Sequence, residues 1–149
     1  MNENTNIVRN ANFAMDAQKL KRCESNLRKA NVMNFLRKLG MNSSQRGTFF
    51  MADIICFCIE NNIYSIPNFK NFSEGFADFY YNFNAHKAQR MIWNIEDSIE
   101  WLEKSPTRND ELLCSFLFEF KFDKSTSAKQ FLINFLLYIS AKNDIFDNN

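Results

Sequence analysis

The chain has 149 residues, of which 46% are hydrophobic and 15% aromatic, and this length and composition fit one domain with a substantial core. Its three Gly and two Pro disfavour a β-sandwich or barrel, which needs many tight turns, and favour long helices with short connections. The net charge of +1 does not by itself indicate a nucleic acid partner, and no apolar run reaches the roughly 18–20 residues of a membrane span.

The charges are distributed unevenly along the chain. Residues 1–46 carry nine basic and three acidic side chains, a net charge of +6, whereas the remainder carries nine basic and fourteen acidic side chains, a net charge of −5. Such asymmetry is typical of a protein with an anionic partner, although a solvated basic helix face explains it equally well.

The four cysteines, Cys23, Cys56, Cys58 and Cys114, indicate neither a metal centre nor a disulfide framework. No Cys-x-x-Cys pair occurs, and the single His86 cannot complete a zinc-finger spacing. We therefore expect buried free thiols, a reducing cytoplasm as the location, and no metal or other cofactor.

The first part of the chain is expected to form a basic helical extension. Residues 1–11 are Asn-rich and predicted to be a disordered tail. Apolar residues at helical spacing predict helix over residues 12–39, with a break near Ser25. We place the extension at residues 12–35.

The main domain is predicted to span residues 36–142, followed by a disordered tail over residues 143–149. Its expected helices cover residues 48–61, 73–81, 84–102, 109–118 and 127–142. Ser73 and Asn84 are expected N-caps, and the alternating phenylalanines of residues 118–122 predict a brief extended piece. The fold class is therefore predicted to be all-α, a compact bundle of six to seven helices.

Two of these predicted helices, over residues 73–81 and 84–102, have the layout of a helix-turn-helix: a short helix, a tight connection and a longer helix. In that motif the second helix enters the major groove of DNA, and its N-terminal residues face the base edges. Here the first half of that helix is basic, and acids begin only at Glu96. The candidate DNA-binding residues are His86, Lys87, Gln89, Arg90, Trp93 and Asn94.

The chemistry of these side chains suits DNA. Arg and Lys can bond guanine O6 and N7, and Gln and Asn can bond adenine through two hydrogen bonds. His86 and Lys87 lie near the helix start, where backbone N–H groups can hold a phosphate. An ordinary surface helix with a polar face explains the same pattern about as well. On either interpretation, the apolar stripe expected to pack inward is Ala88, Met91, Ile92, Ile95 and Ile99.

Three stretches of the sequence carry a family pattern. They are Leu39-Gly40-Met41 with Arg46-Gly47 and Phe49 to Ile55; Phe76-Ala77 with Ala85 to Ile92; and Asn109-Asp110 to Phe118 with the last helix around Phe131. Over residues 36–139 the chain resembles the C-terminal DNA-binding effector domain of the sporulation response regulators (stage 0 sporulation protein A) of spore-forming Firmicutes.

The resemblance implies a six-helix domain without catalytic activity that binds double-stranded DNA as a transcriptional regulator, with homodimers on tandem sites. The contacting positions of the family correspond to His86, Lys87, Gln89, Arg90 and Asn94. This chain departs from the family by having Trp93 and Asn94 where a second arginine is common. We expect no attached receiver domain, because about 35 residues before the domain are too few to form one.

The alternative is a protein–protein interaction module or antagonist, such as one from a mobile element, that keeps the fold without binding DNA. The near-neutral charge, the acidic second half of the helix and the aromatic Trp93 and Trp101 favour this alternative. The basic N-terminal helix could also bind a protein partner or a second copy, although packing on its own domain is the simpler expectation.

An enzyme is not expected, because the chain has one His, no Gly-rich phosphate loop and no nucleophile motif. Two carboxylate pairs stand at helical spacing, Asp53 with Glu60 and Glu96 with Glu100. Solvated or capping carboxylates are the usual explanation for such pairs, so we assign no catalytic residues.

Overall fold

The computed structural model describes residues 26–141, which contain six α-helices and no strand. In chain order the helices are α2 (Asn26–Leu39), α3 (Arg46–Glu60), α4 (Phe69–Tyr81), α5 (Ala85–Glu103), α6 (Asp110–Cys114) and α7 (Lys124–Ala141). The predicted all-α bundle is confirmed. The helix expected over residues 12–25, both predicted tails and Cys23 lie outside the described residues.

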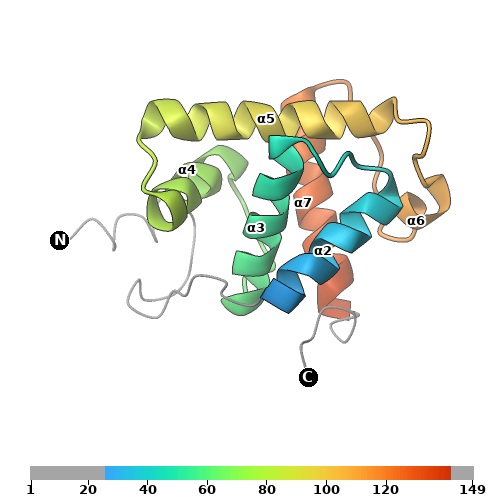
Figure 1. Ribbon diagram of the computed structural model, residues 1–149, viewed down its shortest axis with the longest axis horizontal. Helices are drawn as coiled ribbons and strands as arrows, with labels where there is room; N and C mark the ends of the chain where they lie inside the picture. Colours follow the sequence, from blue (N-terminus) through green and yellow to red (C-terminus); the bar gives the residue numbers. More distant parts are fainter. Residues whose placement is uncertain (1–25, 142–149) are drawn as a thin grey trace.

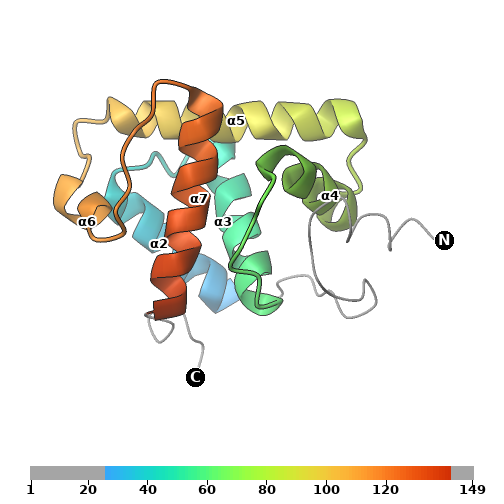
Figure 2. The same ribbon diagram turned by 180° about the vertical axis from the view of Figure 1, so that it is seen from behind.

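The most apolar stretch of the sequence forms α3, the central helix. Every side chain from Met51 to Cys58 is buried, and α3 packs against α2, α5 and α7. α5 lies crosswise over the ends of α3 and α7, with α4 below its first residues and α6 near its last (Figures 1 and 2). One face of α5 therefore rests on the bundle, and the opposite face is directed outward.

Phenylalanine rings fill much of the core. The Phe57 ring of α3 lies 5.1 Å from that of Phe76 in α4. Phe116, which follows α6, lies 5.8 Å from Phe135 in α7. Both pairs have the edge-to-face geometry that aromatic rings prefer, so they stabilise the packing of α4 and α7 beyond simple burial.

Polar pairs join α2, α3 and α4 beside this core. Lys29 Nζ lies 2.6 Å from the buried Asp53 carboxylate, and the Tyr81 hydroxyl donates to the other Asp53 oxygen. Arg28 pairs with Glu60. The prediction that Asp53 and Glu60 are solvated or capping carboxylates is therefore wrong. Two of the basic side chains in the N-terminal excess are also neutralised within the fold, which removes part of the argument for an anionic partner.

α4 begins one turn earlier than predicted. The Asn68 side chain accepts the backbone N–H of Asn71 at 2.9 Å and caps the helix, so Asn68 is the N-cap and the prediction of Ser73 is wrong. Ser73 lies inside the helix and is fully buried. Both residues can cap a helix, but Asn68 follows Pro67, which disfavours helical backbone before it.

α7 also begins earlier, at Lys124 and not at Ser127. The Asp123 carboxylate accepts the backbone N–H of Ser125 at 2.9 Å, which satisfies the first turn. Ser127 is buried and bonds the backbone N–H and carbonyl of Lys121 instead. This contact closes the loop before α7.

The connection from α6 to α7 differs from the prediction. α6 ends at Cys114, and Leu117 then adopts the left-handed conformation with φ of 56°, which a regular helix cannot contain. No strand forms over residues 118–122, so the predicted extended piece is absent. Phe118 turns inward and packs 5.3 Å from the Phe131 ring, which favours an irregular loop over an exposed strand.

The cysteines differ in their surroundings. Cys56 and Cys58 are buried and form no disulfide within residues 26–141, as expected, and burial raises the pKa of Cys58 far above its ordinary value. Cys114 is exposed at the end of α6, so the expectation of a buried thiol is wrong there. None of the helices described over residues 26–141 has both the length and the apolar surface to cross a bilayer.

Two buried serines give a matched test of the polar core. The Ser73 hydroxyl has no hydrogen-bond partner among the described residues, whereas that of Ser127 makes two bonds to Lys121. We expect Ser73→Ala to raise the free energy of unfolding by about 1 kcal/mol and Ser127→Ala to lower it by about 1–3 kcal/mol. Urea denaturation measures both, and a loss of stability in Ser73→Ala would show that its hydroxyl is bonded.

Candidate nucleic-acid interface

A short connection leads from α4 into α5. α4 ends where Asn82 adopts the left-handed conformation, and the Asn84 side chain accepts the backbone N–H of Lys87 at 2.9 Å. Asn84 is thus the N-cap of α5, as predicted. The order of a shorter helix, three connecting residues and a longer helix agrees with the predicted layout. Its use as a DNA-binding helix-turn-helix stays a prediction.

The apolar stripe expected on α5 is confirmed. Ala88, Met91, Ile92, Ile95 and Ile99 are each at most 3% exposed. These positions recur at steps of three and four residues and form the face that rests on the bundle. The candidate DNA-binding residues consequently occupy the remaining faces of the helix.

The structure separates the six candidate residues into two rows. His86, Gln89 and Trp93 form an outer row at helical spacing, and Trp93 is 55% exposed. Lys87, Arg90 and Asn94 form a second row on the side of α5 that faces α3. His86, Lys87 and Arg90 are exposed, whereas Gln89 and Asn94 are half-buried.

The second row lines a cavity between α5 and the start of α3. The cavity has a volume of about 270 Å³. Its lining residues are Arg46, Phe50, Phe83, Lys87, Arg90, Met91 and Asn94. Arg46, the first residue of α3, was not among the predicted site residues. Arg46 could not be predicted from the sequence, because no local pattern indicates that the start of α3 contacts the middle of α5.

Gly47 explains why the two helices come so close. A Cβ atom at this position would lie 2.0 Å from the Asn94 carbonyl oxygen and 2.2 Å from Ser98 Oγ. Real Cβ atoms essentially never approach other atoms so closely, so only glycine fits here. The contact brings the backbone of α3 against that of α5 and places Arg46 beside the second row.

The cavity concentrates positive charge that the fold leaves without a counterion. Within residues 26–141, none of Arg46, Lys87 and Arg90 takes part in an ion pair. No acidic side chain lines the cavity. Lys87 Nζ lies 6.0 Å from the centre of the Phe83 ring, within the range of a cation–π contact. The cavity is therefore suited to an anion.

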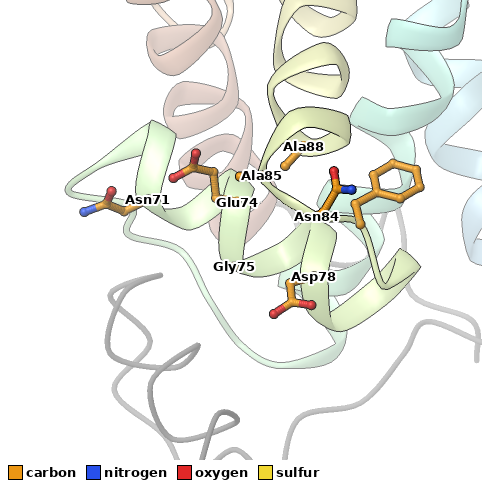
Figure 3. A pocket seen from close by; sticks show the side chains of 8 residues that line it. Asn71, Glu74, Gly75, Asp78, Asn84, Ala85 and Ala88 are labelled. Atoms are coloured by element: carbon orange, nitrogen blue, oxygen red, sulfur yellow. The ribbon is translucent and has the colours of Figure 1, made fainter.

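The other flank of α5 has the opposite charge. A hollow of about 540 Å³ lies between α4 and the start of α5, and Glu74 and Asp78 are its charged lining residues. Figure 3 shows the Glu74 carboxylate on α4 near Ala85 and Ala88 of α5, and the Asp78 carboxylate further along α4, directed away from these alanines. An anion approaching the start of α5 is therefore attracted on the α3 side and repelled on the α4 side.

Acidic residues in the second half of α5 form ion pairs with α7. Lys124, at the start of α7, lies 2.9 Å from Asp97 and 3.1 Å from Glu100. Burial raises the pKa of Glu96, while a hydrogen bond from Ser125 acts in the opposite direction. The prediction of a solvated or capping carboxylate is therefore wrong for Glu96, which is half-buried, whereas Glu100 forms an exposed ion pair. Asp97 and Glu100 thus form exposed ion pairs with the start of α7, which contribute little to stability.

Comparisons with protein-family models, with curated proteins and with solved structures find no match for this chain. The functional interpretation therefore rests on the arrangement of the residues and on the sequence pattern.

Gly47 can be tested against a second helical glycine. We expect Gly47→Ala to lower the free energy of unfolding by about 2 kcal/mol or more, because its Cβ would overlap the α5 backbone. Gly75→Ala, in α4, is the control, since Gly75 is also buried but lines the hollow beside α5, and alanine favours helix by about 1 kcal/mol. Equal effects of the two substitutions in thermal denaturation would contradict the close contact.

Glu96 gives a test by pH. Because the folded pKa of Glu96 is raised above its ordinary value of 4.5, the unfolded chain ionises first as the pH rises, and the contribution of Glu96 to stability falls from about that pH until the folded pKa is passed. Glu96→Gln removes this fall and keeps an oxygen that can accept from Ser125. We expect the variant to be slightly more stable at pH 7 and to show a flatter dependence of stability on pH.

The control for Glu96→Gln is Glu103→Gln at the exposed end of α5, which we expect to leave stability at pH 7 unaltered. Chemical denaturation between pH 4 and pH 7 measures both variants. A free energy of unfolding that changes with pH in the same way in Glu96→Gln as in the parent protein would count against a raised pKa of Glu96.

Proposed function

We propose that this protein is a sequence-specific DNA-binding transcriptional regulator in which the first half of α5 enters the major groove. The observation that carries the proposal is the exposed, acid-free start of α5, where Lys87 and Arg90 have no ion-pair partner among residues 26–141 and Arg46 adds a third cation. Unpaired cations beside an outward helix suit phosphate contacts, and Gln89 suits base contacts.

Two further arguments support the proposal. The order of α4, a three-residue connection and α5 agrees with the helix-turn-helix layout. The resemblance to the sporulation regulator effector domains covers the same segment and implies DNA contacts by residues of α5. The proposal includes a cytoplasmic location, which rests on the free thiols, and a dimer on tandem sites, which rests on the resemblance alone.

A second candidate function is a protein-interaction module that keeps the fold without binding DNA. Trp93 favours it, because this large side chain is 55% exposed in the outer row of α5. Exposed tryptophan is enriched at the energetic centres of protein interfaces. The acid-lined hollow beside the start of α5 would accept a basic partner and adds nothing to DNA binding.

Selection from a random-sequence duplex DNA library, followed by binding measurements, tests the proposal. We expect enrichment of a defined sequence. We expect Lys87→Ala with Arg90→Ala to weaken binding to it at least about tenfold, since each lost contact costs about 1–3 kcal/mol. Lys38→Ala with Lys121→Ala is the matched control, because it removes the same charge at exposed sites outside α5.

Three outcomes distinguish the candidates. Selective loss of affinity in the α5 double variant supports the DNA-binding proposal. Equal affinities of the α5 variant and the control variant would overturn the assignment of these site residues. No enrichment of any duplex, together with a stable complex with a protein partner that Trp93→Ala abolishes, would favour the second candidate.

A further inference from the structure

The cavity between α3 and α5 gathers cations from two helices that are far apart in the sequence. Arg46 comes from the start of α3, and Lys87 and Arg90 come from the first two turns of α5. Like charges held around one cavity repel each other, and no carboxylate among the lining residues offsets this cost. An anion bound between them would relieve the repulsion.

From this arrangement we infer that the cavity binds a backbone phosphate of DNA, and that α5 thereby divides its contacts between two rows. Arg46, Lys87 and Arg90 hold the phosphate and position the protein. The outer row of His86, Gln89 and Trp93 faces the base edges. This inference rests on the proposed DNA-binding function, and it adds which residues bind the phosphate and which contact the bases.

The cavity provides donors that suit a phosphate group. A guanidinium presents a planar set of N–H donors that can bond two phosphate oxygens at once, and Arg46 and Arg90 supply two of these groups. Lys87 adds an ammonium group, and the Asn94 amide adds a neutral donor. A volume of about 270 Å³ leaves room for a phosphate with bridging water.

The apolar part of the lining distinguishes a nucleic acid from free phosphate. Phe50, Phe83 and Met91 also line the cavity. A free phosphate ion has no apolar surface to place against them, whereas each phosphate of DNA adjoins the carbon atoms of two sugars.

The charge of the opposite flank sets the direction from which a strand approaches. Glu74 and Asp78 line the hollow on the α4 side of α5, so a phosphate backbone is repelled there. With one strand on the α3 side, the exposed His86 and Trp93 of the outer row face into the groove, with the half-buried Gln89 between them in the row. His86 and Gln89 lie in the first two turns of this row, where recognition helices contact bases.

The dependence of binding on salt tests this division. The probes are a mixed-sequence duplex of about 30 base pairs and the duplex recovered by selection, with binding measured by fluorescence anisotropy over a range of salt concentrations. Each lost phosphate contact reduces the slope of log K against log [salt] by about 0.9. Because the three cations share one phosphate, we expect Arg46→Gln and Lys87→Gln each to reduce the slope for both duplexes measurably, and by no more than about 0.9.

The same variants should keep the ratio of affinities for the selected and mixed duplexes within about twofold. Gln89→Ala should behave in the opposite way, with an unchanged slope and a ratio reduced at least about fivefold, the equivalent of about 1 kcal/mol. Lys38→Gln, an exposed cation in α2, is the charge-matched control and should change neither quantity. Thermal denaturation of each variant verifies that it is folded.

Failure of this inference differs from failure of the proposed function. If the wild-type protein binds the selected duplex but Arg46→Gln and Lys87→Gln leave the slope unchanged, the phosphate site is overturned and DNA binding stands. A reduced affinity ratio in Arg46→Gln with an unchanged slope would also overturn it, because Arg46 would then contact bases. If the wild-type protein binds neither duplex, both the inference and the proposed function are overturned, even if an NMR titration shows that inorganic phosphate binds at the cavity.

Discussion

The backbone contact at Gly47 is the constraint on which the proposed site depends. Because this residue has no side chain, the first turn of α3 reaches the α5 backbone at Asn94 and also contacts Ser98. The central helix and the outermost helix are thereby joined without an intervening side-chain layer. A larger residue would separate the two helices, and Arg46 would no longer line a cavity with Lys87 and Arg90.

The sequence of α5 shows where its charged residues stand, but not which residues of other helices pair with them. The basic start and acidic end are visible in the sequence, but their partners are not. The acids at Asp97 and Glu100 are matched by Lys124 of α7, whereas Lys87 and Arg90 have no match among residues 26–141. Two carboxylates at one end of the helix therefore share a cation of the protein, and the cations at the other end are left to attract a partner.

Local signals in the sequence predicted α5 well. Its start at the Asn84 cap and its buried stripe depend only on residues within a few turns, and the structure agrees with both. The starts of α4 and α7 were mistaken where several capping residues stand close together, as at Asn68 and Ser73, since burial decides between them. Burial depends on distant parts of the chain.

The site was predictable only where it is local. The exposed residues of α5 follow from its periodicity, but their separation into two rows depends on which neighbour covers each flank. Arg46 stands 48 positions before Asn94, and no short-range pattern links them. The pairing of Asp53 with Lys29 and Tyr81 could not be predicted either, because it joins residues of three different helices.

The length of α5 bears on how such a helix could lie against a duplex. Its 19 residues extend about 28 Å at 1.5 Å per residue, more than twice the roughly 12 Å width of the major groove. A helix laid across the groove would bring Glu96 and Asp97 over a strand of like charge. Electrostatic repulsion therefore favours a tilted approach, in which α5 points its first turns into the groove and lifts its far end clear of the duplex.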